Sequence, residues 1–221
     1  MNSLGDIVTT LFGENTQTVD IVILLTILTL LPSILIMLTG FTRILIVLSF
    51  VRNALGMQQT PPNQVIIGLA LFLTFFVMQP VFAQVNDEAY KPMVAGEIAQ
   101  DEFVEKAMAP LREFMLDQTF KTDQNFFLDL ANAEVEDEAS IPLSVVIPAF
   151  ITSEIKHAFW IGFLVYIPFI VIDMIVASTL MAMGMMMLPP AMISLPFKVL
   201  LFVLVDGWQL IIGTITSSFN L

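Results

Sequence analysis

Residues 158–188 read AFWIGFLVYIPFIVIDMIVASTLMAMGMMML, a run of apolar side chains with a single charge at Asp173. A transmembrane helix needs about 20 apolar residues, each of which rises about 1.5 Å along the axis. Because this run exceeds that length, it predicts an α-helix able to cross a bilayer. The composition agrees, since 57% of the chain is hydrophobic and only 13% is charged.

The chain has three other apolar stretches, two before this one and one after it. Charged residues or prolines interrupt these stretches. The three cover residues 19–50, 65–82 and 192–214, with Arg43 in the first and Lys198 and Asp206 in the last. Charges and helix breakers at membrane depth are tolerated mainly where they face protein or water. The sequence therefore predicts an all-α, membrane-class protein whose segments pack on one another or on other subunits.

Most of the charge is gathered in one insert, since 14 of the 20 acidic residues lie between 86 and 140. The positions of basic residues around the loop 53–63 predict that this loop is cytoplasmic and that the insert lies on the opposite side. We expect four parts: a polar N-terminal lead-in (1–18), a first hydrophobic helical hairpin (19–85), the acidic helical insert (86–140) and a second hairpin (141–221).

The insert is expected to be helical. Apolar residues between 103 and 108 have helical spacing, Pro110 suits the first turn of a second helix, and residues 126–131 predict a third. An amphipathic cap docked on its own subunit is the favoured interpretation. A partner-binding face is the alternative.

Two loops share the spacing Gly-Met-x-x-x-Pro-Pro, at residues 56–62 and 184–190, and each joins one apolar stretch to the next. This repeat predicts two helical hairpins of the same orientation, each turned at its tip by Gly and Pro-Pro. The second tip carries Met185, Met186 and Met187. Flexible thioether side chains fill irregular gaps, so these residues predict either a buried hydrophobic turn or a deformable seal.

No catalytic or metal-binding constellation is visible in the sequence. The chain has one His, no Cys and no phosphate-binding glycine-rich loop, whereas nucleophilic triads and transition-metal sites depend on such residues. We predict no enzymatic activity, no cofactor and no metal. The acidic charge balance also argues against a nucleic-acid partner.

Charged residues in or beside the apolar stretches are candidate functional residues. Two roles are open for Arg43, Asp173 and Asp206. One is a buried structural role, in which Asp173 or Asp206 is the partner of Arg43. The other is a proton-linked role. Glu154 and Lys198 are expected to lie far apart within one subunit. An ion pair between these two residues is therefore predicted across subunits.

A series of motifs, in order along nearly the whole chain beyond Val19, resembles the bacterial flagellar export-gate family FliP. The motifs are FTRILIVL (41–48), RNALG (52–56), PPNQV (61–65), GLALFLTFF (68–76), PLREFM (110–115), PAFITSEIKHAF (148–159), MGMMMLPP (183–190) and LPFKVLLFVLVDGW (195–208).

The resemblance implies a core subunit of the flagellar type III export apparatus. Several copies, a pentamer in the family, would assemble with FliQ and FliR into a helical gate that conducts unfolded flagellar proteins. FlhB and FlhA would lie nearby, and FliO would assist assembly. The gate would sit in the inner membrane, within the membrane ring of the basal body, with its segments drawn up above the bilayer plane.

The resemblance also implies roles for the candidate residues. Met185, Met186 and Met187 match the family's methionine gasket, and Glu154 and Lys198 match its inter-subunit ion pair. A homologous subunit of a virulence-associated type III secretion gate, an injectisome, is one alternative. An ion-coupled small-solute transporter, with Asp173 and Asp206 as coupling sites, is another, and a passive assembly scaffold is a third.

Overall fold

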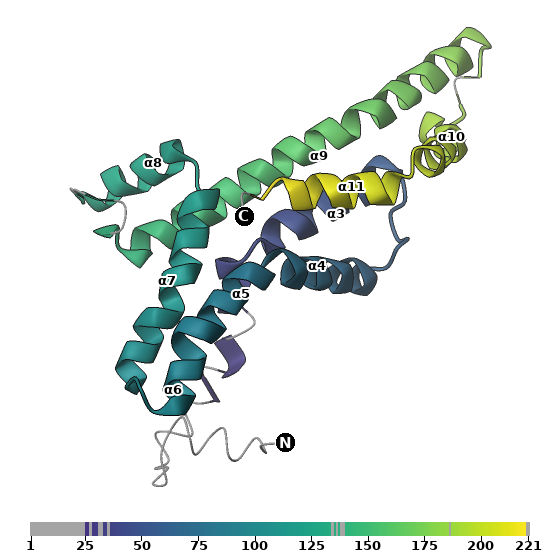
Figure 1. Ribbon diagram of the computed structural model, residues 1–221. Coiled ribbons are helices and arrows are strands. Elements are labelled where there is room, and N and C mark those ends of the chain that lie inside the picture. Colours follow the sequence, from purple (N-terminus) through teal and green to yellow (C-terminus); the bar gives the residue numbers. More distant parts are fainter. Residues whose placement is uncertain are drawn as a thin grey trace.

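The structure, a computed structural model, is all-helical in its described part, where no strand occurs (Figure 1). It describes residues 36–219 apart from 134, 136, 138, 139 and 186, together with 25, 26, 28–30, 33 and 34. The predicted lead-in over 1–18 lies outside the described residues, as does Met186. The prediction of an all-α fold is confirmed.

The helices with assigned bounds follow one another through short connections. In chain order they are α3 (Phe41–Ala54), α4 (Asn63–Val77), α5 (Gln79–Val85), the π-helix η1 (Asn86–Tyr90), α6 (Lys91–Ala95), α7 (Gln100–Gln118), α8 (Lys121–Ala131), α9 (Leu143–Ala182), α10 (Pro190–Leu204) and α11 (Gly207–Ser217).

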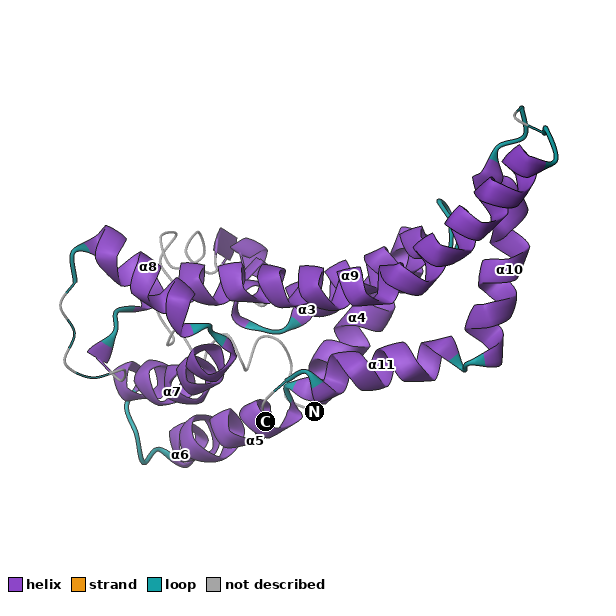
Figure 2. Ribbon diagram, turned by 90° about the horizontal axis from the view of Figure 1, so that it is seen from above, coloured by secondary structure: helices purple, strands orange, loops and turns teal. Residues whose placement is uncertain are grey.

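The 40-residue helix α9 organises the molecule. The helices α3, α7, α8 and α10 all pack against it, and Figure 2 shows α7 and α8 at one of its ends and α10 at the other. At about 1.5 Å per residue, α9 is about 60 Å long, roughly twice the thickness of a bilayer core. It begins fifteen residues before the apolar run at 158, and it continues through Pro148 and Pro168.

Two of the other apolar stretches form bent pairs of helices. Helices α4 and α5–α6 meet at 58°, and α10 and α11 meet at 66°. Pro80 lies in the first turn of α5, where its missing N–H costs nothing, and Asp206 takes the left-handed conformation with φ of 52° before α11. By length and composition α9 qualifies as a membrane span among the described residues, and the total rises to three if each bent pair is one span.

The acidic insert docks on its own chain. Helix α7 packs against α5, η1 and α9, and α8 packs against α9, with Phe114 and Met115 of α7 buried in the core. The prediction that Pro110 begins a new helix is wrong, because α7 runs without a break from Gln100 to Gln118. The expected helix near 126–131 is present as the C-terminal part of α8.

The core lies where α3 crosses the N-terminal half of α9. Ile44, Val47 and Val51 of α3 are buried there. Helix α9 comes especially close at Gly162, where an added Cβ would lie 2.6 Å from the ring of Phe50. The contact between α3 and α9 therefore brings Arg43 and Glu154 to the same interface.

Candidate functional site

Arg43 and Glu154 form a fully buried ion pair between α3 and α9. The Arg43 Nε donates to Glu154 Oε2 at 3.1 Å, and Nη2 donates to Oε1, so the pair is bidentate. Parallel hydrogen bonds of this kind are among the stronger interactions available to a guanidinium. The prediction that Asp173 or Asp206 is the partner of Arg43 is wrong, because α3 packs on the part of α9 that carries Glu154.

The remaining donors of Arg43 reach two further segments. Nη1 donates to the carbonyl oxygen of Ser218 at 2.7 Å and to its Oγ at 3.1 Å, and Nη2 also donates to Gln118 Oε1 at 3.3 Å. The guanidinium lies 4.0 Å from the ring centroid of Phe219, a cation–π contact. We call these five residues, Arg43, Gln118, Glu154, Ser218 and Phe219, the Arg43 centre. It joins α3, α7, α9 and the end of the chain.

A second ion pair, Lys198 with Asp173, joins α10 to α9 at an N–O distance of 2.6 Å. Lys198 is buried and also donates to the carbonyl oxygen of Ala54 at 3.2 Å, while Ser194 Oγ donates to Asp173 at 2.5 Å. Because Ala54 ends α3, its carbonyl has no partner within the helix, and a cation there is favourable. Asp173 is thus held by an ion pair and a hydrogen bond within the chain, and its structural and proton-linked roles both stay predictions.

Glu154 and Lys198 thus each have another partner in the same chain. Glu154 and Asp173, the partner of Lys198, are nineteen residues apart on α9, about 28 Å along the axis. The two ion pairs consequently occupy separate regions of the helix, as the sequence led us to expect for Glu154 and Lys198. A single chain does not test the pair between subunits, which stays a prediction.

A third polar cluster fixes α8 to α9, and the sequence did not indicate it. Asp123 is buried, and it accepts from Ser153 Oγ at 2.7 Å and from Lys156 Nζ. Ser153 Oγ also accepts from the backbone N–H of Phe120 at 3.0 Å, and the Phe120 ring stacks on His157. In the sequence, Asp123 is one acid among many in the insert, so only the docking of α8 distinguishes it.

The methionine tip, residues 183–188, turns the chain at the far end of α9 (Figure 1). Gly184 has φ of +75°, a conformation that L side chains rarely adopt. Met187 is 98% exposed and Met185 is also exposed. Exposed apolar side chains gathered at one tip are typical of a surface that lipid or another protein covers.

Asp206 is exposed, whereas Asp173 on α9 is half-buried. Asp206 occupies the corner between α10 and α11, where its carbonyl accepts from the N–H of Leu210. The break in the helix, which the apolar composition of 192–214 does not reveal, places the residue at the surface of the subunit.

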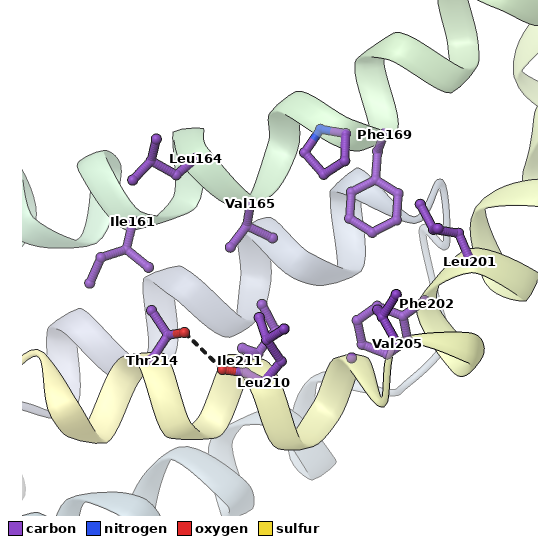
Figure 3. Close-up of a pocket in the computed structure, with 12 residues that line it drawn as sticks. Ile161, Leu164, Val165, Phe169, Leu201, Phe202, Val205, Leu210, Ile211 and Thr214 are labelled. Carbon is purple, nitrogen blue, oxygen red and sulfur yellow. Dashed lines mark hydrogen bonds between the residues drawn. The ribbon is translucent and has the colours of Figure 1, made fainter.

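An apolar pocket of about 460 Å³ separates α9 from α10 and α11. In Figure 3, Ile161 and Val165 of α9 face Ile211 of α11 across it, and Phe169 and Phe202 lie at one end. In the part of the chain that the structure describes, no group of three or more His, Cys, Asp or Glu side chains is placed to hold a metal ion.

Comparison with known proteins places the chain in a family. The family model described as FliP family matches residues 24–215. The flagellar biosynthetic protein FliP of Pectobacterium carotovorum is 57% identical over 92% of this chain and 80% of its own length. The proteins of that name from Bacillus subtilis and Aquifex aeolicus are 53% and 49% identical, over 99% and 94% of this chain and 100% and 88% of their own lengths. The chain therefore belongs to the FliP family.

Proposed function

We propose that this chain is a channel-forming subunit of the flagellar type III protein export gate, in the bacterial inner membrane at the flagellar basal body. Several copies, five by the family pattern, assemble with FliQ and FliR, near FlhB and FlhA and with FliO as the assembly factor. Unfolded flagellar proteins pass through the centre. The family membership and the candidate span in α9 support this proposal.

The observation that carries the gate function is the exposed methionine tip. Each methionine side chain that becomes buried contributes about 1.5–3 kcal/mol. Met185, Met186 and Met187 from several copies would therefore form a stable, dry closure around one axis. Since thioether side chains repack without breaking specific bonds, an advancing polypeptide parts the closure, and the closure re-forms behind it.

Replacement of Met185, Met186 and Met187 by serine is expected to make the assembled gate leak ions. Each buried methionine that is lost removes about 1.5–3 kcal/mol from the closed state, while the helices that hold the subunit are unchanged. The measurement is the membrane potential of cells that carry the variant complex, together with recovery of the complex by purification.

A matched control is Met174→Ser, which changes an exposed methionine on α9 outside the tip. It is expected to assemble and to hold ions as the parent does. If the tip variant assembles and does not leak, the closure is elsewhere. If it fails to assemble, the tip has the role of a scaffold contact.

We also propose that Glu154 and Lys198 pair between neighbouring subunits in the gate. Within the chain these residues bind Arg43 and Asp173, so pairing between subunits requires an exchange of partners. The single reversals Glu154→Lys and Lys198→Glu are each expected to reduce oligomer formation, because like charges then face each other. Native gel analysis of the double reversal should show recovered oligomer. Because the reversals also place like charges beside Arg43 and Asp173, protease resistance of the chain is measured in parallel. A double reversal that is as resistant as the parent but forms no more oligomer than the singles contradicts the pair between subunits.

A further inference from the structure

One face of α11 is polar although the surrounding surface is apolar. Asp206, Gln209, Gly213 and Ser217 follow one another at spacings of three and four residues, which places them on one side of a helix. All four are exposed, and together they line one shallow surface depression, which Thr214, Val205 and Leu210 complete. We call these four residues the polar stripe.

The opposite face of α11 holds the helix in the subunit. Gly207, Ile211 and Ile215 are buried, and an added Cβ at Gly207 would lie 2.3 Å from the ring of Phe202. This packing fixes the rotation of α11 about its axis. The polar stripe therefore has to point away from the subunit.

The neighbouring helices present a different surface. On α10, the outward side chains Leu200, Val203 and Leu204 are exposed and apolar, and Leu204 is 74% exposed. Such residues suit lipid or the apolar surface of another subunit. The contrast between α10 and α11 indicates that the two helices face different surroundings in the assembled protein.

The polar stripe requires water. The side chains of Asp206 and Gln209 form no hydrogen bond or ion pair with any residue that the structure describes. A carboxylate at the centre of a bilayer costs at least about 2.5–3.5 kcal/mol, and backbone or side-chain polar groups without partners add to that cost. A lipid-facing position is therefore excluded for this face.

We propose that the polar stripe of α11 lines the water-filled passage of the export gate and forms the surface along which unfolded polypeptide moves. This inference rests on the function proposed above. The stripe offers one carboxylate, one amide, one hydroxyl and a bare backbone at Gly213. These groups exchange hydrogen bonds with water or with any extended peptide. The apolar side chains that line the same depression are Val205 and Leu210.

The test uses cargo arrested in the complete gate, in cells that produce this chain. Because the chain contains no cysteine, Gln209→Cys and Ser217→Cys each introduce a single thiol. A flagellar cargo protein is fused to a stably folded domain that stops in transit, and it carries one cysteine in the arrested segment. Bismaleimide crosslinking is then scored on denaturing gels. Met187→Cys reports on passage through the tip.

Leu204→Cys is the matched control, since Leu204 is 74% exposed on the apolar outward side of α10 and does not line the depression of the polar stripe. We expect crosslinks to cargo at 187, 209 and 217 and none at 204. A charged, membrane-impermeant maleimide should label Gln209→Cys about tenfold or more faster than Leu204→Cys, because apolar surroundings deplete the reactive thiolate about tenfold per unit of thiol pKa.

The outcomes separate the two proposals. Crosslinks at 187 without crosslinks at 209 and 217 overturn the assignment of the polar stripe and leave the gate function in place. Absence of crosslinks at all three positions contradicts the gate function itself. If impermeant maleimide labels 209 and 217 freely while cargo does not crosslink there, the stripe faces the membrane surface and the assignment also fails.

Discussion

Arg43→Ala is expected to lower the free energy of unfolding of the chain by about 3–5 kcal/mol, the cost of leaving one partner of a buried ion pair without compensation. Glu154 would be left in a fully buried site without its cationic partner. Gln118 and Ser218 would lose a donor. The effect is measured as the thermal midpoint of unfolding of the chain purified in detergent, with resistance to protease as the readout of the folded state.

Two variants show whether the charge pair itself is responsible. Arg43→Met combined with Glu154→Leu removes both charges and keeps most of the volume, and buried pairs replaced in this way are often neutral. We expect the double variant to recover much of the loss. Lys106→Ala breaks the exposed pair with Glu102 and should cost no more than about 0.5 kcal/mol. Equal losses for Arg43→Ala and Lys106→Ala would show that the Arg43 centre contributes little.

Asp173→Ala is expected to destabilise the second hairpin by about 1–3 kcal/mol. The variant leaves the buried ammonium of Lys198 with the carbonyl of Ala54 as its contact. The loss is smaller than at Arg43, because the Asp173 side chain is 36% exposed and water screens part of the interaction. Protease sensitivity of the segment between α9 and α10 is the local measurement.

Asp173→Asn separates a structural role from a proton-linked one. The single oxygen of asparagine can still accept from Lys198, and its NH2 group can donate to the hydroxyl of Ser194, although the side chain carries no charge and does not titrate. For a structural residue, we expect export of flagellar proteins to continue at a reduced level. Complete loss of export in an assembled, stable complex would instead favour proton coupling at this position.

The sequence predicted the helical hairpins because their cause is local. Length, apolar composition and the Gly and Pro-Pro turns are properties of short segments, and the described residues of the four stretches are mostly helical. The break in the helix at Asp206 was missed because a left-handed backbone conformation at one residue does not change the hydropathy of the segment. Pro110 was misassigned because one proline is compatible with both the start and the interior of a helix, and the packing of α7 on α5 and α9 decides between them.

The ion pairs depend on contacts between distant segments, which spacing along the chain does not reveal. Arg43 and Glu154 are separated by 111 positions, and Lys198 and Ala54 by 144. The sequence indicated that Arg43 needs an acid, since an isolated buried charge is costly. The choice among Glu154, Asp173 and Asp206 depends on the register of α3 along α9. That register follows from close contacts such as Gly162 with Phe50.

The exposed surface of α9 has a consequence for how the subunit is kept in the cell. Only 17% of the most hydrophobic window of α9 is covered by the subunit itself, so lipid or neighbouring subunits have to cover the rest. A copy without neighbours leaves this apolar surface open to aggregation, and we expect its lifetime to depend on balanced synthesis of the other subunits.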